Sequence, residues 1–122
     1  MHFERRFTIS GEDAYANIEF RSATSEIRNP DGTIVFQAEN IQVPAQFSQV
    51  ATDILAQKYF RKAGVPVALK QVEETSIPSW LWRSEPDMKA LAKHPKGQRY
   101  TSETSAKQVF DRLAGTWTYW GW

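Results

Sequence analysis

Apolar and polar positions alternate in the first third of the chain, a pattern typical of half-buried strands. The alternation predicts short strands near residues 3–9 and 18–21. Residues 29–32 read Asn-Pro-Asp-Gly, which favours a tight turn because proline presets the first turn position and glycine tolerates positive φ. Apolar residues flank this turn on both sides, so we expect a β-hairpin, with Pro44 closing the strand-rich part.

The spacing changes to a helical one after Pro44. Apolar residues recur three and four positions apart and lie on one side of a helix over residues 48–63. Ser48 can cap its start, and Gly64 followed by a proline can end it. A less regular stretch follows, in which we expect a strand at 65–69, a packed loop at 77–82 and a short helix at 85–93.

The strongest helical pattern lies near the end of the chain, over residues 103–116. Two starts fit this helix: Ser102 followed by Glu103, and Ser105 followed three residues later by Gln108. Gly115 is a weak helix former, and threonines follow it, so we expect the helix to end near Gly115.

Together these elements predict an α+β architecture, in which short antiparallel strands and a hairpin are followed by packed helices. Residues 1–45 are strand-rich and residues 46–122 mainly helical in this interpretation. At 122 residues the chain is about the size of one domain. We see no internal repeat or linker, so we treat residues 1–122 as one region.

The sequence contains no cysteine. This excludes disulfides, zinc–thiolate and iron–sulfur sites, and any chemistry that runs through a thiol of this chain. No apolar run approaches the ~18 residues that a membrane-spanning helix needs, and the first residues lack the apolar stretch of a secretory signal. We therefore expect a cytoplasmic protein with no membrane part.

Charge is unevenly spread, with a net of −3 over residues 1–45 and +4 over residues 46–122. The basic residues gather near Tyr100 and the tryptophan-rich end: Lys89, Lys93, Lys96, Arg99, Lys107 and Arg112. Bases beside aromatic rings can bind single-stranded nucleic acid. The alternative is that the lysines form the solvent-exposed face of a helix and that the aromatic residues belong to a hydrophobic core. We favour this alternative, since a dedicated nucleic-acid binder carries a stronger basic stripe.

Other candidate side chains do not form a site. The two histidines, His2 and His94, have no second histidine or carboxylate at metal-ligand spacing. The acidic pairs Glu12–Asp13 and Glu73–Glu74 are sequence neighbours that face apart, so we expect them to be solvated. The glycines fit no phosphate-binding loop. We therefore assign no catalytic, cofactor-binding or metal-binding residue.

Three stretches of the chain carry a family resemblance: Val35–Pro44, Ala51–Pro66 and Ser105–Trp122. The second and third are the most specific, because helix periodicity alone explains neither. All three resemble the N-terminal region of class II, vitamin B12-dependent ribonucleotide reductases of the long bacterial form. The resemblance covers most of the chain. It implies a role in reducing ribonucleotides to deoxyribonucleotides.

In that family adenosylcobalamin generates a cysteine thiyl radical. A cysteine pair delivers the electrons that reduce the ribonucleotide, and a thioredoxin-type reductant then reduces this pair again. The resemblance places this chemistry in a ten-stranded α/β barrel that follows the N-terminal region. Because the chain has no cysteine, we expect it to be an inactive, incomplete part of the larger enzyme, and we carry over no family site residue.

The last six residues carry three of the five tryptophans, Trp117, Trp120 and Trp122. Large aromatics need a partner surface, so we expect this end to contact the missing barrel. The alternative is a free-standing nucleotide- or nucleic-acid-binding module derived from the family. The first hypothesis predicts self-association of the isolated chain through an exposed apolar end. The second predicts a monodisperse protein.

Overall fold

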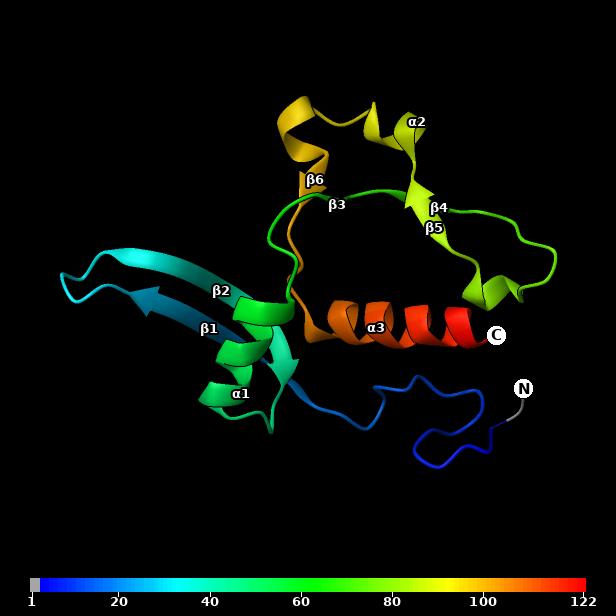
Figure 1. Ribbon diagram of the computed structural model, residues 1–122, viewed down its shortest axis with the longest axis horizontal. Coiled ribbons are helices and arrows are strands. Elements are labelled where there is room, and N and C mark those ends of the chain that lie inside the picture. The colour runs from blue at the N-terminus through cyan, green and yellow to red at the C-terminus, as the bar shows by residue number, and fades with distance from the viewer. Residues whose placement is uncertain (1–2) are drawn as a thin grey trace.

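The computed structural model describes residues 3–122, in which a body of one hairpin and its helices carries an irregular extension (Figure 1). The body consists of a β-hairpin and the helices packed on it. The extension, residues 61–104, is called the arm below. The mixture of antiparallel two-stranded sheets with helices is an α+β fold, as the sequence predicts.

The predicted hairpin is confirmed. Strand β1 (Phe20–Arg28) pairs antiparallel with β2 (Ile34–Pro44), and β2 ends at the expected proline. In the connecting turn the Gly32 amide donates to the Asn29 carbonyl at 2.9 Å. Gly32 has a φ of 89°, which a residue with a Cβ rarely adopts.

A β-bulge in β2 changes which positions face the core. Between the pairs Ala23–Ile41 and Ser25–Ala38, two residues of β2 oppose one of β1. The extra residue is Asn40, which adopts a left-handed φ of 54°. Side chains alternate along a strand, so one additional residue reverses the face. Positions 36 and 38 before the bulge and 41 and 43 after it therefore turn toward the same core.

The strand expected near residues 3–9 is wrong. Residues 3–19 form turns, and regular pairing begins only at Phe20, so the second predicted strand starts later than expected. Phe3, Phe7 and Ile9 are 79%, 97% and 60% exposed. Alternation gives a segment two faces, but a strand also needs a neighbour for its backbone hydrogen bonds.

The helix predicted over residues 48–63 begins as expected but ends earlier. Helix α1 (Gln49–Ile54) is capped by the Ser48 side chain and continues as η1 (Leu55–Tyr59), a π-helical turn. The Phe60 amide donates at 3.1 Å to the carbonyl five residues before it, and Phe60 itself is extended. The wider last turn directs the Phe60 ring into the core.

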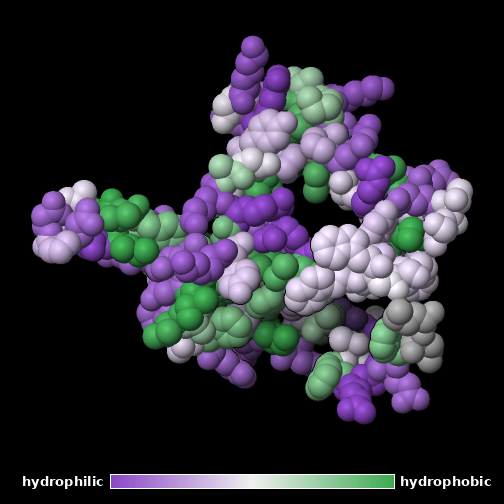
Figure 2. Space-filling model, in the orientation of Figure 1, coloured by the Kyte–Doolittle hydropathy of each residue, from purple (hydrophilic) through white to green (hydrophobic). Residues whose placement is uncertain are grey.

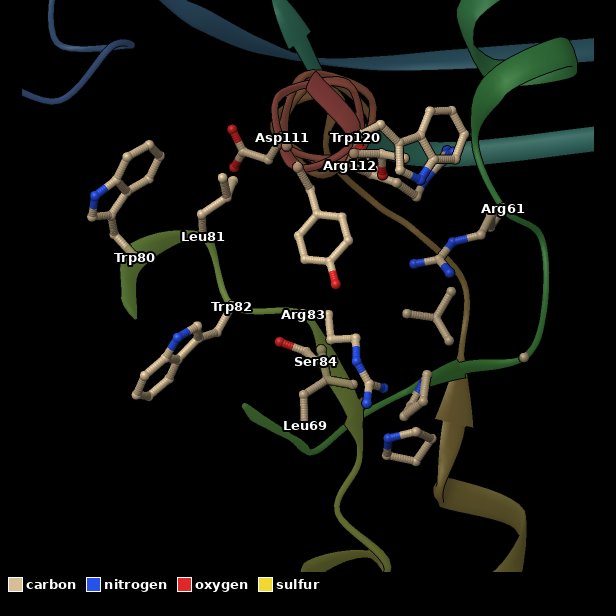
Figure 3. Close-up of a pocket in the computed structure, with 17 residues that line it drawn as sticks. Arg61, Leu69, Trp80, Leu81, Trp82, Arg83, Ser84, Asp111, Arg112 and Trp120 are labelled. Atoms are coloured by element: carbon tan, nitrogen blue, oxygen red, sulfur yellow. Dashed lines mark hydrogen bonds between the residues drawn. The ribbon is translucent and has the colours of Figure 1, made fainter. Parts of the chain in front are cut away.

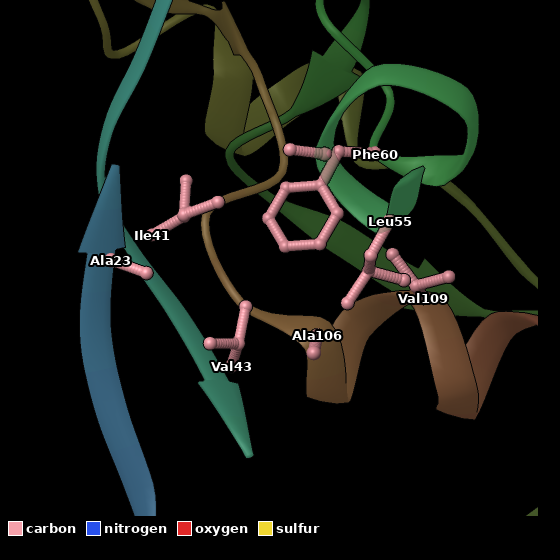
Figure 4. Packing of buried hydrophobic residues seen from close by; sticks show 8 residues of the cluster. Ala23, Ile41, Val43, Leu55, Phe60, Ala106 and Val109 are labelled. Atoms are coloured by element: carbon pink, nitrogen blue, oxygen red, sulfur yellow. The ribbon is translucent and has the colours of Figure 1, made fainter. Parts of the chain in front are cut away.

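The core lies where the hairpin, η1 and the last helix meet (Figure 4). Helix α3 (Ala106–Gly121) packs on the end of β2, and the Gln42 amide donates to the Thr104 carbonyl at 2.8 Å. The buried side chains of this core are Ala23, Ile41, Val43, Leu55, Ala56, Phe60, Ala106 and Val109.

Helix α3 begins at one of the two predicted starts and continues past its predicted end. Ser105 and Gln108 form the capping box. The helix passes through Gly115 and ends at Gly121, so the predicted end near Gly115 is wrong. Contacts with the arm hold the last turns, and they outweigh the weak propensity of one glycine.

The arm is built from short elements: β3 (Val65–Pro66), β4 (Leu69–Gln71), η2 (Ser79–Leu81), β5 (Ser84–Pro86), α2 (Met88–Leu91), η3 (Lys96–Gln98) and β6 (Tyr100–Thr101). Strand β3 pairs with β6, and β4 pairs with β5, both antiparallel. The chain thus runs out from the body and returns beside itself (Figure 1).

The predictions for the arm are partly right. The strand expected at 65–69 is divided into β3 and β4. The expected packed loop at 77–82 contains one 3-10 turn, and Leu81 in it is buried. The helix expected at 85–93 is only α2, because Ser84–Pro86 pairs with β4 instead and Asp87 caps the helix after that pairing.

Candidate functional site

A buried carboxylate joins the base of the arm to α3. The Glu103 side chain is 1% exposed and lies between two arginines. Its Oε1 accepts hydrogen bonds from the Arg61 backbone amide at 2.7 Å and from Arg112 Nη2 at 3.0 Å. Arg112 Nε donates to Oε2 at 3.3 Å, and Arg61 Nε lies 3.5 Å from Oε2. The carboxylate therefore fixes both ends of the arm to the helix.

Two opposing effects act on the pKa of Glu103. Burial alone would raise it, since a charged carboxylate loses its water. The hydrogen bonds from Arg112 and the Arg61 amide, with the charges of both guanidiniums, hold the pKa below its ordinary value. Glu103 is therefore ionised at neutral pH, and the three side chains together carry one net positive charge.

A second set of contacts holds the outer part of the arm against the end of α3. The Tyr119 hydroxyl donates to Glu74 Oε1 at 2.6 Å, and Arg83 Nε lies 3.7 Å from the same oxygen. The Glu74 hydrogen bond is the main cause that raises the pKa of Tyr119. The Trp80 and Trp122 rings meet edge-on, with centroids 5.7 Å apart.

A cavity of about 840 Å³ that is open to solvent lies between these two sets of contacts, lined by α3 on one side and by β3, β4 and β5 on the other. The space-filling view shows this face of the molecule hollowed between arm and body (Figure 2). Arg61 and Arg83 extend into the space from its two sides (Figure 3). Apolar and aromatic side chains form most of the remaining wall.

The end of α3 is an exposed aromatic surface. Trp117, Trp120 and Trp122 are 65%, 75% and 55% exposed, and Trp80 beside them is 67% exposed. A smaller hollow of about 360 Å³ opens between Trp117, Trp122 and Phe3. Exposed apolar patches of this kind mark interaction surfaces. The name "tryptophan surface" is used below for Trp80, Trp117, Trp120 and Trp122.

The structure does not gather the basic residues near Tyr100 into one patch. Lys107 lies over the Tyr15 and Phe20 rings, at 5.3 and 4.8 Å from their centroids, and Arg112 is engaged by Glu103. The other four, Lys89, Lys93, Lys96 and Arg99, belong to the arm.

Most of the histidines and acidic residues considered as candidates do not join a cluster in the described part of the structure. His94 is exposed in the arm, and His2 lies outside the described residues. Glu12 and Glu73 are exposed as expected, but Glu74 is not a solvated acid, because it accepts the Tyr119 hydroxyl. Residues 3–122 contain no group of three side chains able to hold a metal ion, and no helix in that range is long and apolar enough to cross a bilayer.

The Glu103 cluster and the cavity were not predicted from the sequence. The sequence pattern presented Glu103 only as a possible helix-start residue and Arg112 only as one of the basic residues near Tyr100. The Arg61 amide and Glu103 carboxylate are 42 positions apart, a separation that no periodic pattern connects. The one available signal was an acid placed just before a strongly amphipathic helix.

Comparison with known proteins identifies the family of the chain. Residues 21–122 match the family described as class II vitamin B12-dependent ribonucleotide reductase. Over its whole length the chain is 68% identical to the vitamin B12-dependent ribonucleotide reductase of Agrobacterium fabrum and 65% identical to that of Bradyrhizobium diazoefficiens. The chain spans 10% of the length of each relative and matches their N-terminal region. This match does not favour the alternative hypothesis of a free-standing module. The chain belongs to the class II vitamin B12-dependent ribonucleotide reductase family.

Proposed function

We propose that residues 1–122 act as the non-catalytic N-terminal region of an enzyme that reduces ribonucleotides to deoxyribonucleotides for DNA synthesis. The observation that carries the proposal is the identity of 68% and 65% along the whole chain to two vitamin B12-dependent reductases, of which it spans a tenth. The absence of cysteine supports a non-catalytic role, because the family's radical and its reducing pair are both thiols.

The cofactor belongs elsewhere in this proposal. Adenosylcobalamin supplies a radical that a cysteine must receive, and none of the 122 residues is a cysteine. The side chains present therefore do not fit the cofactor's chemistry, and we assign no reaction step to them. The catalytic barrel binds the cofactor and the ribonucleotide and receives electrons from a thioredoxin-type reductant. The whole enzyme works in the cytoplasm.

The partner of the tryptophan surface is then the rest of the reductase polypeptide. Trp117, Trp120 and Trp122 are each more than half exposed at the end of α3. The relatives extend over about ten times the length of this chain, so a large partner is available to cover the rings. Burying three indoles would stabilise the association by several kcal/mol, at roughly 25 cal/mol per Å² of apolar area.

A chimera tests the catalytic part of this proposal. Residues 1–122 replace the matching segment of the Agrobacterium fabrum reductase, and deoxyribonucleotide formation is measured with adenosylcobalamin and a dithiol. We expect the chimera to be active and the 122-residue chain alone to give no product. Product from the chain alone would overturn the proposal, as would a folded chimera without activity.

The docking part needs a different measurement. In the chimera, Trp117→Asp and Trp120→Asp should loosen the N-terminal region, seen as faster proteolysis of that region. Val50→Asp is the control, because Val50 is 68% exposed on α1, away from the tryptophan surface. In the isolated chain, sedimentation should show self-association that replacing the three tryptophans by serine abolishes. Equal proteolysis rates for the tryptophan variants and the Val50→Asp control, with unchanged self-association of the serine variant, would refute the docking.

A further inference from the structure

The charged side chains on the cavity wall are three arginines and one aspartate: Arg61, Arg83, Arg112 and Asp111. Two of them are already engaged. Arg112 donates to both Glu103 oxygens and to the Tyr59 carbonyl, and Asp111 accepts the Tyr15 hydroxyl at 2.7 Å. Glu103 and Glu74, the acids nearest to Arg61 and Arg83, are not among the residues that line the cavity, so arginines outnumber acids on its wall.

Arg61 and Arg83 retain most of their binding capacity. The nearest approach of each to its acid is through Nε, at 3.5 Å to Glu103 and 3.7 Å to Glu74. Their terminal nitrogens make no hydrogen bond within residues 3–122. About half of each side chain is exposed, and both extend into the cavity (Figure 3). A guanidinium with free terminal nitrogens matches a carboxylate or phosphate in a two-bond fork.

The rest of the wall is suited to an apolar or aromatic group. The Trp120 indole lies on the Arg61 side of α3, and Leu69 lies on the opposite wall (Figure 3). The volume of about 840 Å³ is in the range of small-molecule sites, which are mostly apolar with a few convergent polar groups. An indole face also binds planar groups by offset stacking.

We propose that this cavity binds a small organic anion, with its phosphate or carboxylate between Arg61 and Arg83 and its apolar body against Trp120. Two guanidiniums and one indole together form a recognition element, and about half of each arginine side chain remains exposed to a ligand. The site shares Trp120 with the tryptophan surface, but Arg61 and Arg83 lie outside that surface. Loss of anion binding in an Arg83 variant is therefore distinguishable from loss of docking.

Calorimetric titration of the 122-residue chain with phenyl phosphate, benzoate and inorganic phosphate tests the site. We expect phenyl phosphate or benzoate to bind, and the better of the two identifies the anionic group. Arg83→Gln should weaken that binding about tenfold, the value of one charge-assisted hydrogen-bonding group, and Arg83→Lys should weaken it less. Arg28→Gln is the matched control, because Arg28 is also half exposed and paired with one acid, Glu26.

A second variant separates the two parts of the ligand. Trp120→Leu should weaken phenyl phosphate and leave inorganic phosphate unchanged. Circular dichroism of each variant establishes that it is folded. The proposal is overturned if neither aromatic anion binds at millimolar concentration, or if Arg83→Gln and Arg28→Gln bind equally well.

Discussion

Arg112 donates to both oxygens of the Glu103 carboxylate, at 3.0 and 3.3 Å, where 1% of the Glu103 side chain is exposed. This two-bond pairing lies at the point where the arm leaves and rejoins the body. Arg61, in the segment where the chain enters the arm, donates its backbone amide to the same carboxylate at 2.7 Å. One acid thus connects two segments that are distant in sequence with α3.

Removing Arg112 should destabilise the fold strongly. Arg112→Leu leaves a buried carboxylate with only Arg61 to balance it, and breaking a buried pair in this way costs about 3 kcal/mol. Urea unfolding followed by circular dichroism measures the loss. Arg28→Leu is the control, because it breaks an exposed pair with Glu26 and should change stability by less than about 1 kcal/mol. Equal losses for the two variants would contradict a buried role for Glu103.

The same carboxylate predicts a pH dependence. Because the folded pKa of Glu103 is held below its ordinary value of 4.5, the unfolded chain binds its proton first as pH falls. The contribution of Glu103 is therefore fully present above pH 4.5 and is lost as pH falls through the lower folded pKa. Glu103→Gln should be less stable than the native chain at pH 7, and the difference should shrink toward pH 3. A difference that stays constant over this range would contradict the prediction.

The family resemblance rests on residues that build the core rather than a site. The stretches Val35–Pro44, Ala51–Pro66 and Ser105–Trp122 contain seven of the eight buried core residues, all except Ala23. The turn at residues 29–32 was sufficient to predict the hairpin, Ser48 predicted the start of α1, and Ser105 with Gln108 was one of the two starts predicted for α3. Local chemistry determines these features, because a turn or a cap involves residues within a few positions of each other.

The features that sequence could not predict depend on distant partners. The bulge at Asn40 reverses the alternation within β2, so a strict period of two misassigns half of that strand. Phe3 and Phe7 alternate like a strand but have no neighbouring strand. The cavity exists because Glu103 and Tyr119 attach the arm to α3 at two places, which leaves space between them.

The start of α3 can be assigned by substitution. The sequence offers both Ser102 and Ser105 as possible N-caps of α3. In the structure the Ser105 hydroxyl oxygen accepts a hydrogen bond from the Lys107 amide at 3.2 Å. Ser105→Ala should therefore cost about 1 kcal/mol, the usual value of an N-cap. Ser102→Ala is the matched control and should change the unfolding midpoint little. The reverse order of the two effects would place the helix start at the other serine.

Gly115 offers a stabilising substitution inside α3. A Cβ built at this position meets no atom within 4 Å, so alanine fits without displacing a neighbour. Alanine loses less backbone entropy than glycine on entering a helix, and Gly115→Ala should raise stability by about 0.5–1 kcal/mol. Gly64→Ala is the contrasting control. It is equally free of close neighbours, but its φ of 76° strains any residue with a Cβ, so this variant should lose stability. Thermal unfolding of both variants measures the two changes, and a destabilised Gly115→Ala would show that α3 does not continue through Gly115 in solution.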